Sequence, residues 1–163
     1  MKDVIIMLGS KSDIEYAKES LKVLDKLGVS CEVVVSSIHR TPDKTIEIAK
    51  SLESKGFKAV ICMAGYAAHL PGVISALSSL PIIAVPLSGS PLTGLDALYS
   101  QQMPAGVPVA AMTIGTAGAI NAAIFAARII ALSNEVVKEK LRLYVKDMAD
   151  KASQPLDSNW FSV

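Results

Sequence analysis

The chain has 163 residues, 51% of them hydrophobic, and its 16 basic and 15 acidic side chains leave a formal net charge of +1. The length fits a single domain, and the absence of a basic stripe with interleaved aromatic residues argues against a nucleic-acid-binding protein. Every apolar run is interrupted before membrane-spanning length, and Met1–Leu8 is too short for a secretory signal, so we expect a cytoplasmic protein that does not enter the membrane.

Apolar residues exceed what one domain core needs. The stretch from Ala59 to Leu132 is rich in alanine and glycine and carries almost no charge. A monomer would expose part of this surface, so we expect a homo-oligomer. Cys31 and Cys62 fall inside predicted strands, and we expect buried, reduced thiols.

Short apolar runs alternate with helical patterns along the first half of the chain. Val4–Leu8 predicts a strand buried on both faces, and the apolar period that follows predicts a helix ending at Gly28, with Ser12 and Glu15 as its capping box. The next predicted elements are a strand over Val29–Ser36, a helix that begins at Thr41-Pro42-Asp43 and ends at Gly56, and a strand over Lys58–Met63.

The second half continues the alternation. In order, it predicts a small helix over Leu70–Ser79, a strand over Pro81–Val85, a helical turn or two within Leu92–Ser100, and a strand over Val107–Met112. The almost uncharged Ala117–Leu132 predicts a helix buried on all sides. Asn134 would cap a final amphipathic helix that runs to about Ala152.

Strands that alternate with helices in this way indicate a parallel sheet covered on both faces. We therefore predict an α/β fold: a doubly wound, three-layer sandwich of the flavodoxin-like type, with about five strands and a C-terminal helix. Residues 1–154 would form one catalytic domain, and residues 155–163 a C-terminal tail.

Polar residues follow the first two predicted strands. Gly9-Ser10-Lys11-Ser12-Asp13 joins a strand to a helix start, where free backbone amides favour an anion, although Ser12 read alone is equally well a helix cap. The loop is neither a dinucleotide fingerprint nor a P-loop. After the second strand, Ser37, His39 and Arg40 offer an imidazole and a guanidinium suited to phosphate, unless they are simply exposed surface residues.

The only other histidine, His69, follows the third strand within a stretch of small residues. Ligands of parallel α/β sheets bind outside the carboxyl ends of the strands, so the two imidazoles predict a reaction centre there. A structural histidine that ties two loops together is nearly as good an interpretation of His69. Two later loops, Ser88–Pro91 and Gln102–Pro108, are either pocket walls or simple connections. The spacing of His and Cys predicts no metal site, and no Gly-x-Ser-x-Gly elbow predicts a hydrolase.

Three loop motifs together resemble one family closely: Gly9-Ser10-Lys11-Ser12-Asp13, Ser37-Ile38-His39-Arg40-Thr41-Pro42 and Ala67-Ala68-His69-Leu70-Pro71-Gly72. In type and spacing they are similar to the N5-carboxyaminoimidazole ribonucleotide mutases of purine biosynthesis, the class I PurE family. The resemblance continues through Gly94–Ser100, Gln102–Val109 and the segment Asn121-Ala122-Ala123, and so covers nearly the whole chain.

The resemblance implies an isomerase that moves a carboxylate from the exocyclic nitrogen of an aminoimidazole ribonucleotide to ring carbon 4, with no metal, cofactor or ATP. Ser10, Ser12 and Arg40 would bind the 5′-phosphate, and Asp13 would bind the ribose hydroxyls. His39 would be the general acid/base. Ser37, Ala67, His69 and Leu70 would complete the substrate-binding wall, and the family's octamer would place the sites at subunit contacts.

Ile38, Tyr66 and a shortened Ser100–Met103 connection depart from the family's usual pattern, in which alanine and glycine take the places of Ile38 and Tyr66. Three alternatives stay open: a carboxylase, classed as a lyase, that adds free carbon dioxide to aminoimidazole ribonucleotide; a carboxylase of a pyridinium-type nucleotide; and a non-catalytic nucleotide-binding module.

Overall fold

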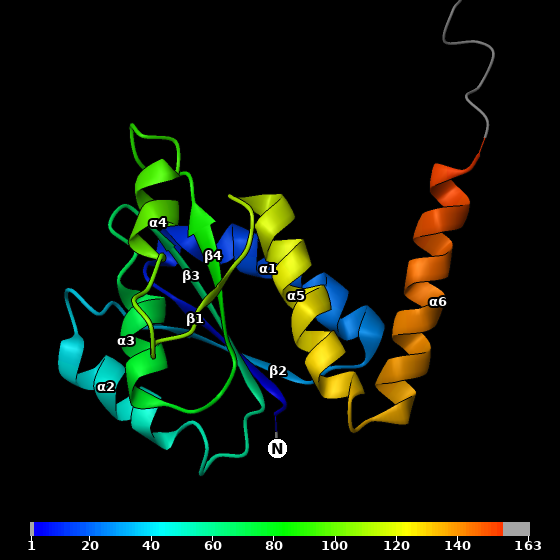
Figure 1. The fold of residues 1–163 in the computed structure, drawn as a ribbon, viewed down its shortest axis with the longest axis horizontal. Coiled ribbons are helices and arrows are strands. Elements are labelled where there is room, and N and C mark those ends of the chain that lie inside the picture. Colours follow the sequence, from blue (N-terminus) through cyan, green and yellow to red (C-terminus); the bar gives the residue numbers. More distant parts are fainter. Residues whose placement is uncertain (1, 155–163) are drawn as a thin grey trace, which may run out of the picture.

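Five parallel strands form the centre of the computed structural model, which describes residues 2–154 (Figure 1). Their order in the sheet is β2-β1-β3-β4-β5. The strands are β1 (Val4–Leu8), β2 (Cys31–Val35), β3 (Ala59–Gly65), β4 (Ile82–Leu87) and β5 (Ala110–Ala111). The flavodoxin-like doubly wound sheet predicted from the alternation is thereby confirmed.

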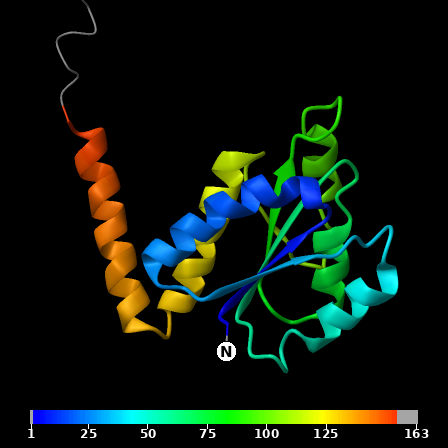
Figure 2. The same cartoon turned by 180° about the vertical axis from the view of Figure 1, so that it is seen from behind.

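Helices cover both faces of this sheet (Figures 1 and 2). They are α1 (Ile14–Leu27), α2 (Pro42–Ser51), α3 (Leu70–Leu77), α4 (Leu95–Ser100), α5 (Thr116–Ala131) and α6 (Glu135–Ala152), with a short 3-10 helix, η1 (Lys11–Asp13), before α1. The helices α1 and α5 share one hydrophobic cluster with the sheet, and α2 and α3 share the other. Two apolar interfaces, one on each face, explain why the central strands are apolar at every position.

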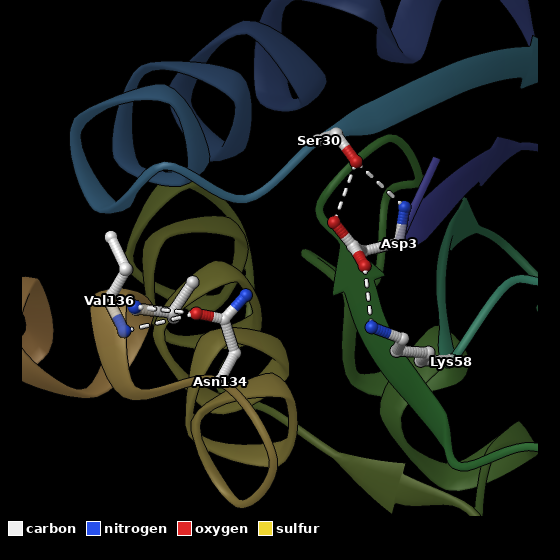
Figure 3. Close-up of polar contacts among 6 residues, drawn as sticks. Asp3, Ser30, Lys58, Asn134 and Val136 are labelled. Atoms are coloured by element: carbon white, nitrogen blue, oxygen red, sulfur yellow. Dashed lines mark hydrogen bonds and ion pairs between the residues drawn. The ribbon is translucent and has the colours of Figure 1, made fainter. Parts of the chain in front are cut away.

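The C-terminal helix α6 packs against α5 and α1 on the side of these helices that faces away from the sheet (Figure 1). Asn134 caps it as predicted, because its side-chain oxygen accepts hydrogen bonds from the amides of Val136 and Val137, each at 3.1 Å (Figure 3). None of the helices within residues 2–154 is long and apolar enough to cross a membrane. The predicted tail, 155–163, lies outside the described residues.

A polar cluster joins three strands at their amino ends, the edge opposite the strand-end loops (Figure 3). The carboxylate of Asp3 accepts a hydrogen bond from the Ser30 hydroxyl at 2.7 Å and pairs with the Lys58 ammonium at 2.9 Å. Burial alone would raise the pKa of Asp3, but these hydrogen bonds together outweigh burial and hold the pKa below its usual value. This edge is therefore occupied by structural contacts, and the opposite edge is left for a ligand.

Three expectations about these elements need correction. The last strand is limited to Ala110–Ala111, shorter than the predicted Val107–Met112, because it lies at the sheet edge and pairs only with β4. The helix α5 is not buried on all sides: Phe125 is 38% exposed and lines cavities that residues of β5 and α6 also line. Cys62 is buried as predicted, whereas Cys31, on the edge strand β2, is only partly buried.

Both thiols are free, and their environments make them unreactive. Burial raises the pKa of Cys31 to about 12, and it raises the pKa of the Cys62 thiol still further. Because the thiolate is the reactive form, neither cysteine is suited to nucleophilic chemistry near neutral pH. The expectation of reduced thiols with a packing role fits both positions.

One buried hydrogen bond links α1 to α5 across the layer they share. The Ser20 hydroxyl, fully buried, donates to the Ala119 carbonyl at 2.6 Å. We expect Ser20→Ala to lower the free energy of unfolding by about 1 kcal/mol, since an uncharged hydrogen bond contributes about that much. Thermal unfolding would then show a melting temperature roughly 2–4 °C lower.

Ser54→Ala is the matched control, because the Ser54 hydroxyl donates to the Ser51 carbonyl at 3.0 Å on the exposed surface. We expect this control to change stability by less than about 0.5 kcal/mol. Equal losses in the two variants would show that the α1–α5 hydrogen bond contributes nothing beyond a surface contact.

Candidate active site

The carboxyl ends of β1, β2, β3 and β4 surround a cavity of about 540 Å³. The loops that follow these four strands supply its walls, as the parallel arrangement requires. Every residue to which the resemblance assigns a catalytic or binding role lines it: Ser10, Ser12, Asp13, Ser37, His39, Arg40, Ala67, His69 and Leu70. Residues from three distant segments of the chain therefore meet at one site.

The loop after β1 is held by a capping box between Ser10 and Asp13. The Ser10 amide donates to Asp13 Oδ2 at 2.9 Å, and the Ser10 hydroxyl accepts from the Ser12 amide at 3.4 Å. The predicted box of Ser12 and Glu15 is wrong, because the short helix η1 starts the helical turn two residues earlier. Glu15 instead pairs with Lys18 at 2.6 Å on the surface. The hydroxyls of Ser10 and Ser12 lie 2.9 Å apart at the cavity wall.

Asp13 is a carboxylate kept partly out of water. Burial raises its pKa, and the hydrogen bonds from the Ser12 hydroxyl and the Ser10 amide offset that effect only in part. A carboxylate that is partly desolvated and has few partners is suited to accept hydrogen bonds from a ligand's hydroxyls. Asp13 lies in the cavity wall, where the hydroxyls of a bound ligand can reach its carboxylate.

We expect Asp13→Asn to raise the melting temperature at pH 7. Because the pKa of Asp13 is higher in the folded state than its ordinary value of 3.8, the stabilising effect of protonation is present at low pH. That effect is lost as the pH rises through the folded pKa. Asparagine removes the buried charge while keeping an oxygen to accept the Ser10 amide. Thermal unfolding at pH 7 and at pH 3.5 checks this, since the gain should shrink at the lower pH; an equal gain at both would contradict it.

The loop after β2 turns sharply before α2. The Thr41 amide donates to the Ser37 carbonyl at 2.8 Å, and the Arg40 amide donates to the Ser37 hydroxyl at 3.3 Å. Thr41 occupies the N-cap position as predicted, but its hydroxyl donates to the Ser37 carbonyl at 3.0 Å instead of capping the helix. This tight turn places the side chains of His39 and Arg40 at the cavity.

The two histidines contact each other directly. His39 Nε2 and His69 Nδ1 lie 2.8 Å apart, and their rings meet edge to face with centroids 5.0 Å apart. One of these nitrogens must carry the proton that the other accepts, so the protonation of each ring fixes the tautomer of its neighbour. The bond joins the loop after β3 to the loop after β2, as the interpretation of His69 as a histidine that ties two loops together requires. The pair can therefore hold and pass a proton inside the cavity.

The loop after β3 brings backbone, more than side chains, to the cavity. The site favours glycine at position 65, because a Cβ there would lie only 3.3 Å from the Leu87 carbonyl oxygen of the paired strand β4. The Ala68 amide donates to the Ser100 hydroxyl of α4 at 2.8 Å, which anchors the loop from outside the site. This hydrogen bond fixes the backbone between Ala67 and Leu70, which both line the cavity.

The sequence reasoning missed two lining residues, Tyr16 and Leu87. Tyr16 belongs to the first turn of α1, close to the loop already identified, and its hydroxyl lies 3.4 Å from the Ser88 hydroxyl after β4. Of the two later loops, Ser88–Pro91 contributes Gly89 to this cavity. The segment Gln102–Pro108 instead lines a separate cavity of about 710 Å³ beside β5.

No cluster of three or more His, Cys, Asp or Glu side chains able to hold a metal ion occurs in the part of the chain that the structure describes. The functional groups that line the site are the histidine pair, one carboxylate, one guanidinium and several hydroxyl groups. These groups can bind a phosphorylated sugar and move a proton.

Comparison with known proteins gives one consistent result. The model of the AIR carboxylase family matches residues 3–151. The N5-carboxyaminoimidazole ribonucleotide mutase of Pyrococcus horikoshii is 45% identical over 150 residues, which cover 91% of this chain and 84% of that protein. The enzyme of the same name from Escherichia coli is 41% identical over 155 residues, covering 94% and 92%. The crystal structure of Treponema denticola PurE has a TM-score of 0.84 at 27% identity and covers 93% of this chain and 94% of its own.

Proposed function

Because this chain belongs to the AIR carboxylase family, we propose that it is an N5-carboxyaminoimidazole ribonucleotide mutase, an isomerase of purine biosynthesis. One observation carries the proposal: the cavity holds a pair of histidines, His39 and His69, in hydrogen-bond contact beside hydroxyl and guanidinium groups suited to a nucleotide phosphate. We take residues 1–154 as the catalytic domain, in keeping with the family match over residues 3–151.

In this proposal the phosphate lies at the start of η1 and α1. Ser10 and Ser12 present hydroxyls there, and Arg40 reaches the same cavity from the loop after β2. Asp13 accepts hydrogen bonds from the ribose hydroxyls. Substrate binding is thus divided between one anion-binding side and one carboxylate.

The reaction requires one proton to be donated to the substrate and one to be removed from it. When the bond between the exocyclic nitrogen and the carboxylate breaks, carbon dioxide leaves and the nitrogen takes a proton. Carbon 4 then forms a bond to the same carbon dioxide and loses its own proton. His39 supplies the first proton and removes the second, so it ends the cycle in its starting state. The hydrogen bond between His39 and His69 keeps the His39 ring oriented through both steps.

The carbon dioxide must stay in the site between the two steps. In this proposal the bound nucleotide and the cavity wall at Ser37, Ala67 and Leu70 together keep water from the carbon dioxide, which favours its recapture at carbon 4 over release.

We also propose a cytoplasmic homo-octamer with sites at subunit contacts. Support comes from apolar side chains left exposed on α5 and α6 and between them: Phe125, Leu132, Val136, Leu143, Val145 and Met148. A second copy of the chain is the simplest cover for such a surface. Analytical ultracentrifugation would give a single species of eight chains.

Carboxylate transfer from carboxyl-labelled N5-carboxyaminoimidazole ribonucleotide, measured in unlabelled bicarbonate, tests the activity. We expect the label to be retained in the carbon-4 product. Product formed mainly from aminoimidazole ribonucleotide and free carbon dioxide would identify a direct carboxylase instead. Binding of the nucleotide without any product would identify a non-catalytic module.

A further inference from the structure

Tyr66 has a backbone conformation that an aromatic residue rarely adopts. Its φ of +55° lies in the left-handed region, which Thr93 is the only other non-glycine residue within 2–154 to enter. Bulky residues are strained there, and such strain gathers at ligand sites. The turn has a clear cause: β3 stays paired with β4 up to Gly65 and Leu87, and the chain must reverse at once to bring Ala68 to Ser100. Glycine would make this turn without strain, so the turn does not explain why a tyrosine occupies position 66.

Tyr66 lies at the cavity, and the other described residues leave most of it exposed. Tyr66 lines the cavity, yet 61% of the residue is exposed. Its Cε2 atom is 3.9 Å from where a Cβ on Gly89 would lie, so the ring reaches over the loop that follows β4. A large, exposed aromatic face at a binding cavity is available to be covered by a ligand.

The order of the strands sets Tyr66 across the cavity from the histidines. In the sheet order β2-β1-β3-β4-β5, His69 turns from the end of β3 toward His39 after β2, whereas Tyr66 turns from the same strand toward Gly89 after β4. The serines and Asp13 after β1 lie between these two sides. A planar base bound in the cavity would therefore have imidazole groups toward its β2 side and the phenol toward its β4 side.

We propose that Tyr66 is a specificity-determining residue that stacks on the heterocycle of the bound nucleotide, an inference that rests on the proposed function of this cavity. The strained backbone is retained because the ring covers one face of the base and orients carbon 4 toward His39. The ring recognises a flat heterocycle and not the ribose phosphate, so its contribution depends on the base alone.

Calorimetric titration of the full chain with two compounds tests this. The probes are 4-carboxy-5-aminoimidazole ribonucleotide, which carries the base, and ribose 5-phosphate, which lacks it. We expect Tyr66→Ala to weaken binding of the nucleotide by about tenfold, within the range known for aromatic stacking on a base, and to leave ribose 5-phosphate unchanged. Tyr66→Phe should bind both compounds like the unaltered chain. Tyr99→Ala, which removes a 69% exposed tyrosine from outside the cavity, is the matched control.

Tyr66→Gly distinguishes the effect of the ring from the effect of backbone strain. Glycine adopts this φ without strain, so this variant removes both, whereas Tyr66→Ala removes only the ring. Tyr66→Gly should fold at least as stably as the unaltered chain and bind the nucleotide as weakly as Tyr66→Ala. Unchanged nucleotide binding in both variants, or equal losses for both compounds, would overturn the role of Tyr66 while leaving the proposed function intact. If the unaltered chain bound neither compound, the proposed function itself would fail, and the role of Tyr66 with it.

Discussion

His39→Asn is expected to lower turnover by about 10²–10⁴-fold, the usual contribution of a general acid/base, while nucleotide binding is kept. Asparagine has a similar volume and still forms hydrogen bonds, but it cannot exchange a proton near neutral pH. The loop that carries His39 is held by bonds from the Thr41 and Arg40 amides to Ser37, none of which involves the imidazole. The substitution should therefore leave the cavity in place.

Single-turnover rates together with titration of the product nucleotide measure this effect. His69→Asn is the informative companion, because it removes the partner 2.8 Å from His39 without removing the proposed acid/base. We expect a smaller loss of turnover and an altered pH profile, since the His39 ring loses the group that sets its tautomer. If His39→Asn turned over at the unaltered rate, His39 would have no part in proton transfer.

Arg40→Ala is expected to weaken binding of the phosphorylated nucleotide by roughly 10–150-fold, the equivalent of a charge-assisted hydrogen bond of about 1.5–3 kcal/mol. The same change should spare the unphosphorylated nucleoside, because the guanidinium is assigned to the phosphate alone. Titrations at low and high salt add a second signature: the difference between the two ligands should narrow as salt screens the charge.

Lys44→Ala controls for the loss of any nearby cation, since Lys44 lies on α2 close in sequence to Arg40 but does not line the cavity. We expect little change for this variant. Equal weakening of nucleotide and nucleoside by Arg40→Ala would contradict the phosphate assignment and would instead indicate a disturbed loop.

Much of this fold could be predicted from short-range sequence patterns. The fully buried strands β1, β3 and β4 were predictable because each is an apolar run bounded by a glycine or proline turn and followed by a helical period. The cap at Asn134 was predictable for the same reason, since a cap depends on residues two or three positions away. The short edge strand β5 was overpredicted, because strand length at an edge depends on a neighbour that the local pattern does not describe.

By itself, the sequence determined which loops line the cavity: the positions after β1, β2 and β3 follow from the strand ends, and their residue types predict phosphate, sugar and proton chemistry there. Only the tertiary structure decided how these residues meet. The hydrogen bond between His39 and His69 and the turn of Tyr66 toward Gly89 both depend on backbone directions at the sheet edge. The physical reason is range: periodicity and capping act within about one helical turn, whereas contacts between loops depend on how strands far apart in the chain are ordered side by side.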